Sequence, residues 1–161
     1  MTYLHDMIAR TAQPGRITWI GLRPARRAAM QAVAEAWLDK GGLDGDRARA
    51  GKRALTVLQA EHLAAIGSYL GRAPVNPADL RRNLVVSGLN LAGSKGRRMR
   101  LGTAIVEITV ICAPCSRMEE TFGHGGYGAV RGHGGWCAQV ISAGPVCLGD
   151  PVTYLSETRG R

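Results

Sequence analysis

Short apolar runs, bounded by glycine, proline or charged residues, recur along the whole chain. Many of them are rich in valine, isoleucine and threonine, which favour strands over helices. About six or seven strands with short helices between them indicate a barrel or a curled sheet. The last two runs are expected to pair with each other across a turn. The predicted strands are residues 16–22, 54–58, 83–87, 102–111, 136–142 and 146–155.

Helical spacing of apolar residues interrupts this strand pattern in three places. Residues 28–38 combine the spacing with several alanines, which predicts a helix. Residues 59–70 form an amphipathic pattern that ends at Gly71. Asn76 and Pro77 predict the start of a short helix, because asparagine caps helices and proline fits their first turn.

The composition supports one mainly β domain. Apolar residues make up 45% of the 161 residues, which suffices for a core, and 22 glycines imply many turns. The predicted fold class is mainly β with short helices (α+β), in a single domain over residues 1–161. The first 15 residues are expected to form a loose arm or a short helix, and residues 157–161 are expected to fray.

The net charge of +9 comes mostly from arginine. A solvated basic surface explains any single cluster of these residues, whereas the clusters together indicate an anionic partner. Aromatic residues, which stack on bases, make up only 5% of the chain, so nucleic acid is not the expected partner.

Cellular location is inferred from apolar runs and cysteines. No apolar run reaches the length of a membrane span, and the N-terminus lacks the pattern of a signal peptide. Four cysteines in a chain of this length do not indicate a disulfide scaffold. The expectation is a soluble protein of the reducing cytoplasm, with no membrane partner.

The segment after the strand predicted at 102–111 holds the cysteine best placed for chemistry. Pro114 ends that strand, and a serine and a glutamate at positions 116 and 119 have the spacing of a capping box, which predicts a helix start. Cys115 would then lie at a helix N-terminus beside Arg117. Both surroundings favour the thiolate, the form that attacks or binds a metal.

Cys112 and Cys115 form a Cys-x-x-Cys pair that has several interpretations. A zinc site would need two more ligands, for which His124, His133 and Cys137 are available at loose spacing. A thioredoxin-type redox pair would need a βαβ context, which is not predicted. At the end of an apolar strand, Cys112 is expected to be buried, neutral and inert.

Two further segments are candidates for anion binding. Residues 123–135 are rich in glycine and contain both downstream histidines. They form either a flexible surface loop or a lid whose backbone amides approach an anion. Residues 81–83, Arg-Arg-Asn, are either a charged helix end or a phosphate clamp of two guanidinium groups and an amide.

Five segments carry a resemblance to a known family: Gly42-Leu43-Asp44-Gly45-Asp46-Arg47, then 80–91 (Leu-Arg-Arg-Asn-Leu-Val-Val-Ser-Gly-Leu-Asn-Leu), 101–109 (Leu-Gly-Thr-Ala-Ile-Val-Glu-Ile-Thr), 112–120 (Cys-Ala-Pro-Cys-Ser-Arg-Met-Glu-Glu) and the closing 134–152. Together they resemble the MOSC domain, named for the molybdenum cofactor sulfurase C-terminus. The resemblance covers a core of about residues 17–152 and is strongest to small stand-alone bacterial members.

The resemblance implies a MOSC-like β-barrel with an accessory helix or two, and a site for the pyranopterin molybdenum cofactor. By its place in the motif, the family's ligand cysteine falls on Cys115, which would be both metal ligand and catalytic residue. The family's Arg-x-Asn segment, which handles pterin and phosphate in amidoxime-reducing relatives, falls on Arg81 and Asn83. The candidate cofactor-binding residues are Arg81, Arg82, Asn83, Cys115, Arg117, His124 and His133.

Two stretches depart from what the family implies or from the residue pattern. Leu22-Arg23-Pro24 stands where the amidoxime-reducing relatives carry Lys-Ser. The family also implies extended backbone over residues 28–38, where the alanine content predicts a helix.

Three functions are compatible with these residues. The first is an oxidoreductase component that reduces N-hydroxylated or N-oxide compounds at molybdenum. Its electrons would come from a separate protein, because the sequence shows no flavin, haem or nicotinamide motif. The second is a sulfur carrier in which Cys115 bears a persulfide received from a sulfur donor. The third is a zinc-binding or metal-free binding module.

Overall fold

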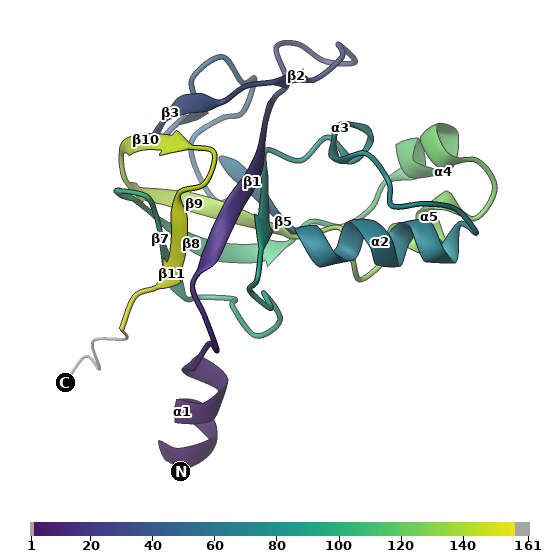
Figure 1. Ribbon diagram of the computed structural model, residues 1–161. Coiled ribbons are helices and arrows are strands. Elements are labelled where there is room, and N and C mark those ends of the chain that lie inside the picture. The colour runs from purple at the N-terminus through teal and green to yellow at the C-terminus, as the bar shows by residue number, and fades with distance from the viewer. Residues whose placement is uncertain (1, 157–161) are drawn as a thin grey trace.

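A closed β-barrel forms the centre of the computed structural model, which describes residues 2–156 (Figure 1). Seven strands follow one another around it in the order β1-β11-β7-β8-β9-β5-β6, and β6 pairs with β1 to close the circle. β5 and β6 run parallel and the other neighbours antiparallel, so the barrel is mixed. The predicted mainly β fold with short helices is confirmed. The barrel strands are β1 Gly15–Leu22, β5 Leu55–Gln59, β6 Leu84–Ser87, β7 Arg98–Leu101, β8 Ala104–Ile111, β9 Trp136–Ser142 and β11 Pro151–Tyr154.

The helix predicted over residues 28–38 is wrong. This stretch forms β2 (Gln31–Ala32), which pairs antiparallel with the end of β1, and β3 (Glu35–Asp39). β3 pairs with β4 (Gly42–Leu43) and β10 (Gly144–Cys147) in a second, three-stranded sheet. Pairing with distant strands therefore overrides the weak helical preference of the alanines. The extended backbone that the family resemblance implied is present.

The predicted pairing of the last two strands is wrong. The segments at 136–142 and 146–155 do not pair with each other, since β9 lies between β8 and β5, and β11 lies between β7 and β1. The strand predicted from residue 102 is the second arm of a hairpin that turns at Gly102, where φ is +61°. A Cβ there would lie 2.5 Å from the Asp150 carboxylate, so glycine permits the turn to pack closely.

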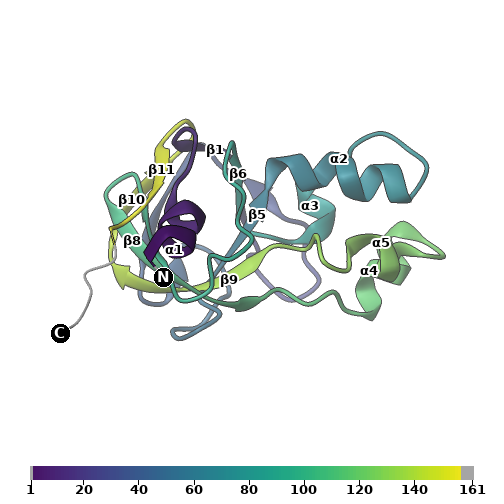
Figure 2. The ribbon, with the colours of Figure 1, turned by 90° about the horizontal axis from the view of Figure 1, so that it is seen from below.

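The helices lie outside the barrel (Figure 2). The two predicted at 59–70 and from Asn76 are confirmed, and Asn76 Oδ1 accepts a hydrogen bond from Ala78 N (3.0 Å). The N-terminal segment forms a short helix. None of the helices in residues 2–156 is long and apolar enough to cross a membrane. Their bounds are α1 Thr2–Ala9, α2 Ala60–Tyr69, α3 Pro77–Leu80, α4 Ser116–Phe122 and α5 Gly126–Val130.

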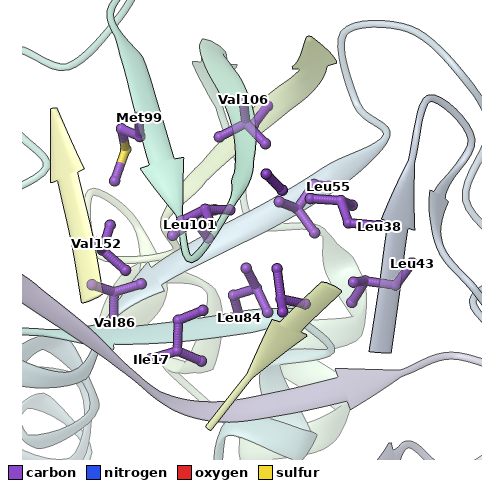
Figure 3. Close-up of a cluster of buried hydrophobic side chains, with 14 of the residues drawn as sticks. Ile17, Leu38, Leu43, Leu55, Leu84, Val86, Met99, Leu101, Val106 and Val152 are labelled. Atoms are coloured by element: carbon purple, nitrogen blue, oxygen red, sulfur yellow. The ribbon is translucent and has the colours of Figure 1, made fainter. Parts of the chain in front are cut away.

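Two apolar clusters hold these layers together. The larger fills the barrel, where side chains from β1, β3, β5, β6, β7, β8 and β11 point inward (Figure 3). The smaller joins the outer faces of β5 and β6 to the helices on one side of the barrel, and consists of Leu58, Ile66, Val75, Leu80, Val85, Met118, Ala129 and Val130. It fixes α4, and with it the start of the predicted site. The expected frayed end, residues 157–161, lies outside the described residues.

Candidate cofactor-binding site

Cys115 lies at the surface, at the residue before α4. Its backbone is extended (φ −126°, ψ 174°) and its carbonyl accepts a hydrogen bond from Met118 N (2.9 Å). The predicted helix start at Ser116 is confirmed, but Cys115 occupies the cap position and no side chain caps the helix. The thiol is therefore exposed beside the first turn of α4.

The predicted capping box does not form, because Glu119 points to the next helix. Its carboxylate accepts hydrogen bonds from Tyr127 N (2.8 Å) and Gly125 N (3.2 Å), at the start of α5. These bonds, that from Tyr127 first, hold the pKa of Glu119 below its ordinary value. Glu119 thus joins α4 to α5 and stabilises the segment that follows Cys115.

Four arginines from distant parts of the sequence lie close enough for three of them to repel the charge of the fourth. Burial lowers the pKa of Arg81, and repulsion from Arg117, Arg23 and Arg47 lowers it further. We call these four residues the arginine cluster. One carboxylate, that of Asp46, opposes them, so four positive charges and one negative charge leave a surplus of three. A surplus of this kind is an anion-binding feature.

Asp46 fixes one member of the cluster and connects it to Asn83. The Asp46 carboxylate is fully buried and accepts hydrogen bonds from Arg23 N (2.6 Å), Arg23 Nη2 (3.0 Å) and Asn83 Nδ2 (3.2 Å). Arg23 belongs to the stretch Leu22-Arg23-Pro24, which stands in place of the Lys-Ser pair of the amidoxime-reducing relatives. Asp46 belongs to the Gly-Leu-Asp-Gly-Asp-Arg motif at 42–47. The departure from the Lys-Ser pattern therefore still places a cation at the site.

Asn83 is buried, and every hydrogen-bonding group of its side chain has a protein partner. Its Oδ1 accepts bonds from Thr56 N (3.1 Å) and Thr56 Oγ1 (3.2 Å). Its Nδ2 donates to Gly21 O (3.1 Å) and to the Asp46 carboxylate. In this arrangement Asn83 orders the loops that carry Arg23 and Arg47, and direct contact of Asn83 with a cofactor stays a prediction.

Arg81 and Arg82, both predicted to bind the cofactor, donate hydrogen bonds to different backbone carbonyls around the site. Arg81 adopts a left-handed conformation (φ 57°) after α3, and its Nη1 donates to Ala28 O. Arg82 Nε donates to Gly134 O (2.7 Å) and its Nη1 to Leu80 O (3.0 Å). Arg82 therefore ties the start of β6 to the residues that precede β9.

Cys112 is buried as predicted, but it is not isolated. Its Sγ lies 3.1 Å from the Sγ of Cys137. The hydrogen bond with Cys137 lowers the pKa of Cys112, and burial opposes this effect. The positive charges of Arg82, Arg23 and Arg53 lower the pKa further, and together these effects bring it to about 6. The same bond and burial raise the pKa of Cys137. Cys112 is therefore in contact with a second thiol and near cations that favour its thiolate, which the sequence did not predict.

The segment 123–135, expected to be a surface loop or a lid, contains a helix in its middle: α5, which packs against α2 and α4. His124 is exposed near Glu119. His133 lies against the rings of His62 (4.8 Å between centroids) and Tyr69 (5.3 Å). Burial and His133 lower the pKa of His62. No contact in the described residues brings either histidine to the arginine cluster, and their cofactor-binding role stays a prediction.

A sequence profile of the MOSC domain matches residues 44–153. The chain belongs to the MOSC domain family. Solved structures share the fold of this MOSC protein along most of its length. The YUAD protein from Bacillus subtilis is 17% identical, with a TM-score of 0.79 and coverage of 91% of this chain and 98% of that one.

Two structures of YiiM are also similar. The Escherichia coli protein is 24% identical, with a TM-score of 0.69 and coverage of 89% of this chain and 71% of that one. The Geobacillus stearothermophilus protein is 20% identical, with a TM-score of 0.73 and coverage of 91% and 78%. At these identities the likeness concerns the fold alone. The search of curated proteins found no match.

The donor set of this MOSC chain fits the cofactor that its family name implies. An exposed thiol can supply one soft ligand, and the arginine cluster can hold a phosphate. In residues 2–156, no group of three or more His, Cys, Asp or Glu side chains is placed to hold a metal ion by itself.

Sequence reasoning named Cys115, Arg81 and Arg117 but missed the roles of Arg23, Asp46 and Cys137. The family motif at 42–47 contains Asp46 and Arg47, so it could have pointed to both residues as part of the site. Nothing in the local sequence linked Cys137 to Cys112, because their contact depends on the pairing of β8 with β9.

Proposed function

We propose that this MOSC protein binds the pyranopterin molybdenum cofactor, with the Cys115 thiolate as the protein's ligand to molybdenum and the arginine cluster as the site of the cofactor's phosphate. The observation that carries the proposal is the exposed thiol two residues before Arg117, itself part of a cluster with three surplus positive charges. Guanidinium groups bind phosphate through paired hydrogen bonds, which matches an anionic cofactor better than a neutral ligand.

Each residue of the site would have a separate task. Cys115 would hold the metal, and Arg81, Arg117 and Arg47 would neutralise phosphate charge. Asp46 holds Arg23 in place through two of its atoms, so that this cation needs no reorganisation when an anion arrives. The bound cofactor would supply a metal that changes oxidation state by two electrons, which is the chemistry required to reduce an N–O bond.

The proposed reaction is the reduction of N-hydroxylated or N-oxide compounds, with electrons from a separate donor protein. A separate donor is proposed because the sequence contains no motif for a flavin, haem or nicotinamide group, the usual carriers of electrons to a metal centre. The exposure of Cys115 supports access by both a substrate and a partner to the same face of the protein.

The same exposure also favours a second candidate function. A sulfur carrier needs a thiol that partner proteins can reach, and Cys115 would hold the transferred sulfur as a persulfide. The zinc alternative finds less support, because the described residues contain no cluster of protein ligands.

Elemental analysis separates these functions. The protein would be purified from a host that makes the molybdenum cofactor, then analysed for molybdenum, zinc and cyanide-labile sulfur. We expect about one molybdenum per chain, together with reduction of an N-hydroxylated test compound by a chemical reductant. Labile sulfur without molybdenum would favour the sulfur carrier, and zinc in stoichiometric amount would favour the third function.

A further inference from the structure

Two buried thiols, those of Cys112 and Cys137, lie in contact with each other. The Sγ atoms of Cys112 and Cys137 are 3.1 Å apart, and the side chains are 8% and 4% exposed. Both are free cysteines. A disulfide bond is about 2.05 Å long, so closure by about 1 Å would join them. None of the roles proposed above uses this pair.

The pairing of β8 with β9 explains the contact. Ile108 lies opposite Ala138, and regular pairing from there would place Cys112 opposite residue 134. A shift in register between Ile108 and Ile111 places Ile111 opposite Trp136 instead. Cys112 N then donates to Gly135 O (2.9 Å). The shift therefore brings Cys112 one position closer to Cys137, as a bulge re-aims a side chain.

Cationic groups face the pair from three other elements. Arg82 precedes β6, Arg23 follows β1, and Arg53 precedes β5, and their charges all act on Cys112. A Cβ at Gly134 would lie 3.0 Å from Cys112 O and 3.2 Å from Arg82 Nη2, so glycine there lets Arg82 approach the cysteine. The cations favour a thiolate on Cys112, while Cys137 serves as the thiol that donates to it.

We propose that Cys112 and Cys137 form a redox-active pair that a hydroperoxide oxidises to a reversible disulfide. The Cys112 thiolate attacks the peroxide oxygen, which forms a sulfenic acid and releases water or an alcohol after proton uptake. The Cys137 sulfur then attacks the Cys112 sulfur, which forms the S–S bond and releases water. Two electrons pass from the two sulfurs to the peroxide, and a thiol reductant returns them.

This pair differs from the two other cysteines of the chain. Cys115 is exposed and has no sulfur partner among the described contacts. Burial, Asp150 and Glu35 raise the pKa of Cys147, which disfavours its thiolate. Cys147 is therefore the internal control for reactivity, and Cys115 is the competitor for oxidation. The inference does not depend on cofactor binding, because it needs only the protein and a peroxide.

The test maps cysteine oxidation in the reduced full-length protein after a graded dose of hydrogen peroxide. Remaining thiols would be alkylated, disulfides then reduced and labelled differently, and peptides analysed by mass spectrometry. We expect a Cys112–Cys137 linkage that dithiothreitol removes, with Cys147 still a thiol. A linkage of Cys112 to Cys115, or a Cys112 thiol that survives a dose that oxidises Cys115, would overturn the proposal.

Two variants test the assigned order of attack, and Cys147→Ser serves as the matched control. In Cys137→Ser, Cys112 should pass to sulfinic acid, because no second thiol traps the sulfenic acid. In Cys112→Ser, Cys137 should remain a thiol at the same dose. The reverse pattern, with Cys137 oxidised in the absence of Cys112, would contradict the assignment of Cys112 as the attacking thiolate. The linkage in the wild-type protein decides the main proposal even if either variant fails to fold.

Discussion

Cys112 and Cys115 are three residues apart, yet the fold gives their thiols opposite surroundings. Cys115 is exposed before α4, and Cys112 is buried against Cys137. The sequence alone identified the strand end and the helix start correctly, because both depend on Pro114 and its immediate neighbours. It could not identify the cations around Cys112, because Arg82, Arg23 and Arg53 are distant in sequence. They come near that thiol only when the strands of the barrel pair.

The first prediction concerns the charge of Cys112. In a protein that retains only Cys112 and Cys137, thiolate ultraviolet absorbance should rise with an apparent pKa near the value of about 6 reached by Cys112, rather than near the ordinary cysteine value of about 8.5. Cys137 should stay a thiol over this range, since its pKa is raised. Arg53→Gln should move the transition to higher pH, because it removes a nearby positive charge. A transition near pH 8.5 in the parent protein would contradict the stabilised thiolate.

A second prediction at this scale concerns Asn83. Asn83→Ala removes four side-chain hydrogen bonds, so that Thr56 N, Thr56 Oγ1, Gly21 O and the buried Asp46 carboxylate each lose one partner. The free energy of unfolding should fall by about 3 kcal/mol, since each buried unsatisfied group costs about 1–3 kcal/mol. Urea denaturation would measure this against Asn90→Ala, whose exposed side chain accepts one local bond from Ala92 N (3.0 Å). Equal losses in the two variants would rule out a structural role for the Asn83 network.

At the scale of elements, most helices and strands were predictable, whereas the long-range pairings were not. The helix from Asn76 was predictable, because its cap and its proline are adjacent in sequence. Residues 28–38 were mistaken for a helix, because their partners in β1 and β10 lie elsewhere in the chain. For the same reason the sequence did not show that β10 pairs with β3, and β11 with β7 and β1, instead of with the predicted partner β9.

The glycines of α5 provide a test at this scale. A Cβ at Gly126 would lie 2.3 Å from Met118 O, on the backbone of α4, whereas a Cβ at Gly128 meets nothing within 4 Å. Gly126→Ala should therefore separate α4 from α5 and lower the free energy of unfolding by about 1–3 kcal/mol, as overpacking does. Gly128→Ala should be neutral or stabilising by up to about 1 kcal/mol, because alanine favours helix. Thermal melts of both variants make the comparison, and a harmless Gly126→Ala would show that α5 is loosely attached.

At the scale of the whole molecule, the barrel gathers cations that lie far apart in the sequence. The arginine cluster draws on four places in the chain, and its members come together only when the barrel closes. They are Arg23 after β1, Arg47 after β4, Arg81 after α3 and Arg117 within α4. Net charge predicted an anionic partner, and the family motifs pointed to Arg81 and Arg117. Composition could not show which of the many arginines form one site, since that depends on strand order.

If the arginine cluster binds the cofactor, loss of a positive charge should weaken cofactor retention only when that charge belongs to the cluster. Arg117→Gln should weaken retention of the cofactor about tenfold, because a hydrogen bond to a charged group contributes about 1.5–3 kcal/mol and about 1.4 kcal/mol is tenfold. Arg100→Gln removes the same charge from β7, on the other side of the barrel from α4 (Figure 1), and should leave retention unchanged. Gel filtration followed by cofactor analysis measures both. Equal loss in the two variants would indicate a general charge effect instead of a site.

Molybdenum content per chain, in proteins purified from a host that makes the cofactor, tests the proposed role of Cys115 most directly. The wild type and Cys147→Ser should each carry about one molybdenum per chain. Cys115→Ser should fold with an unchanged melting temperature, because the side chain is exposed and makes no hydrogen bond in the described structure, yet carry almost no molybdenum. Wild-type molybdenum content in Cys115→Ser, or a molybdenum-free wild type that carries zinc, would contradict the assignment.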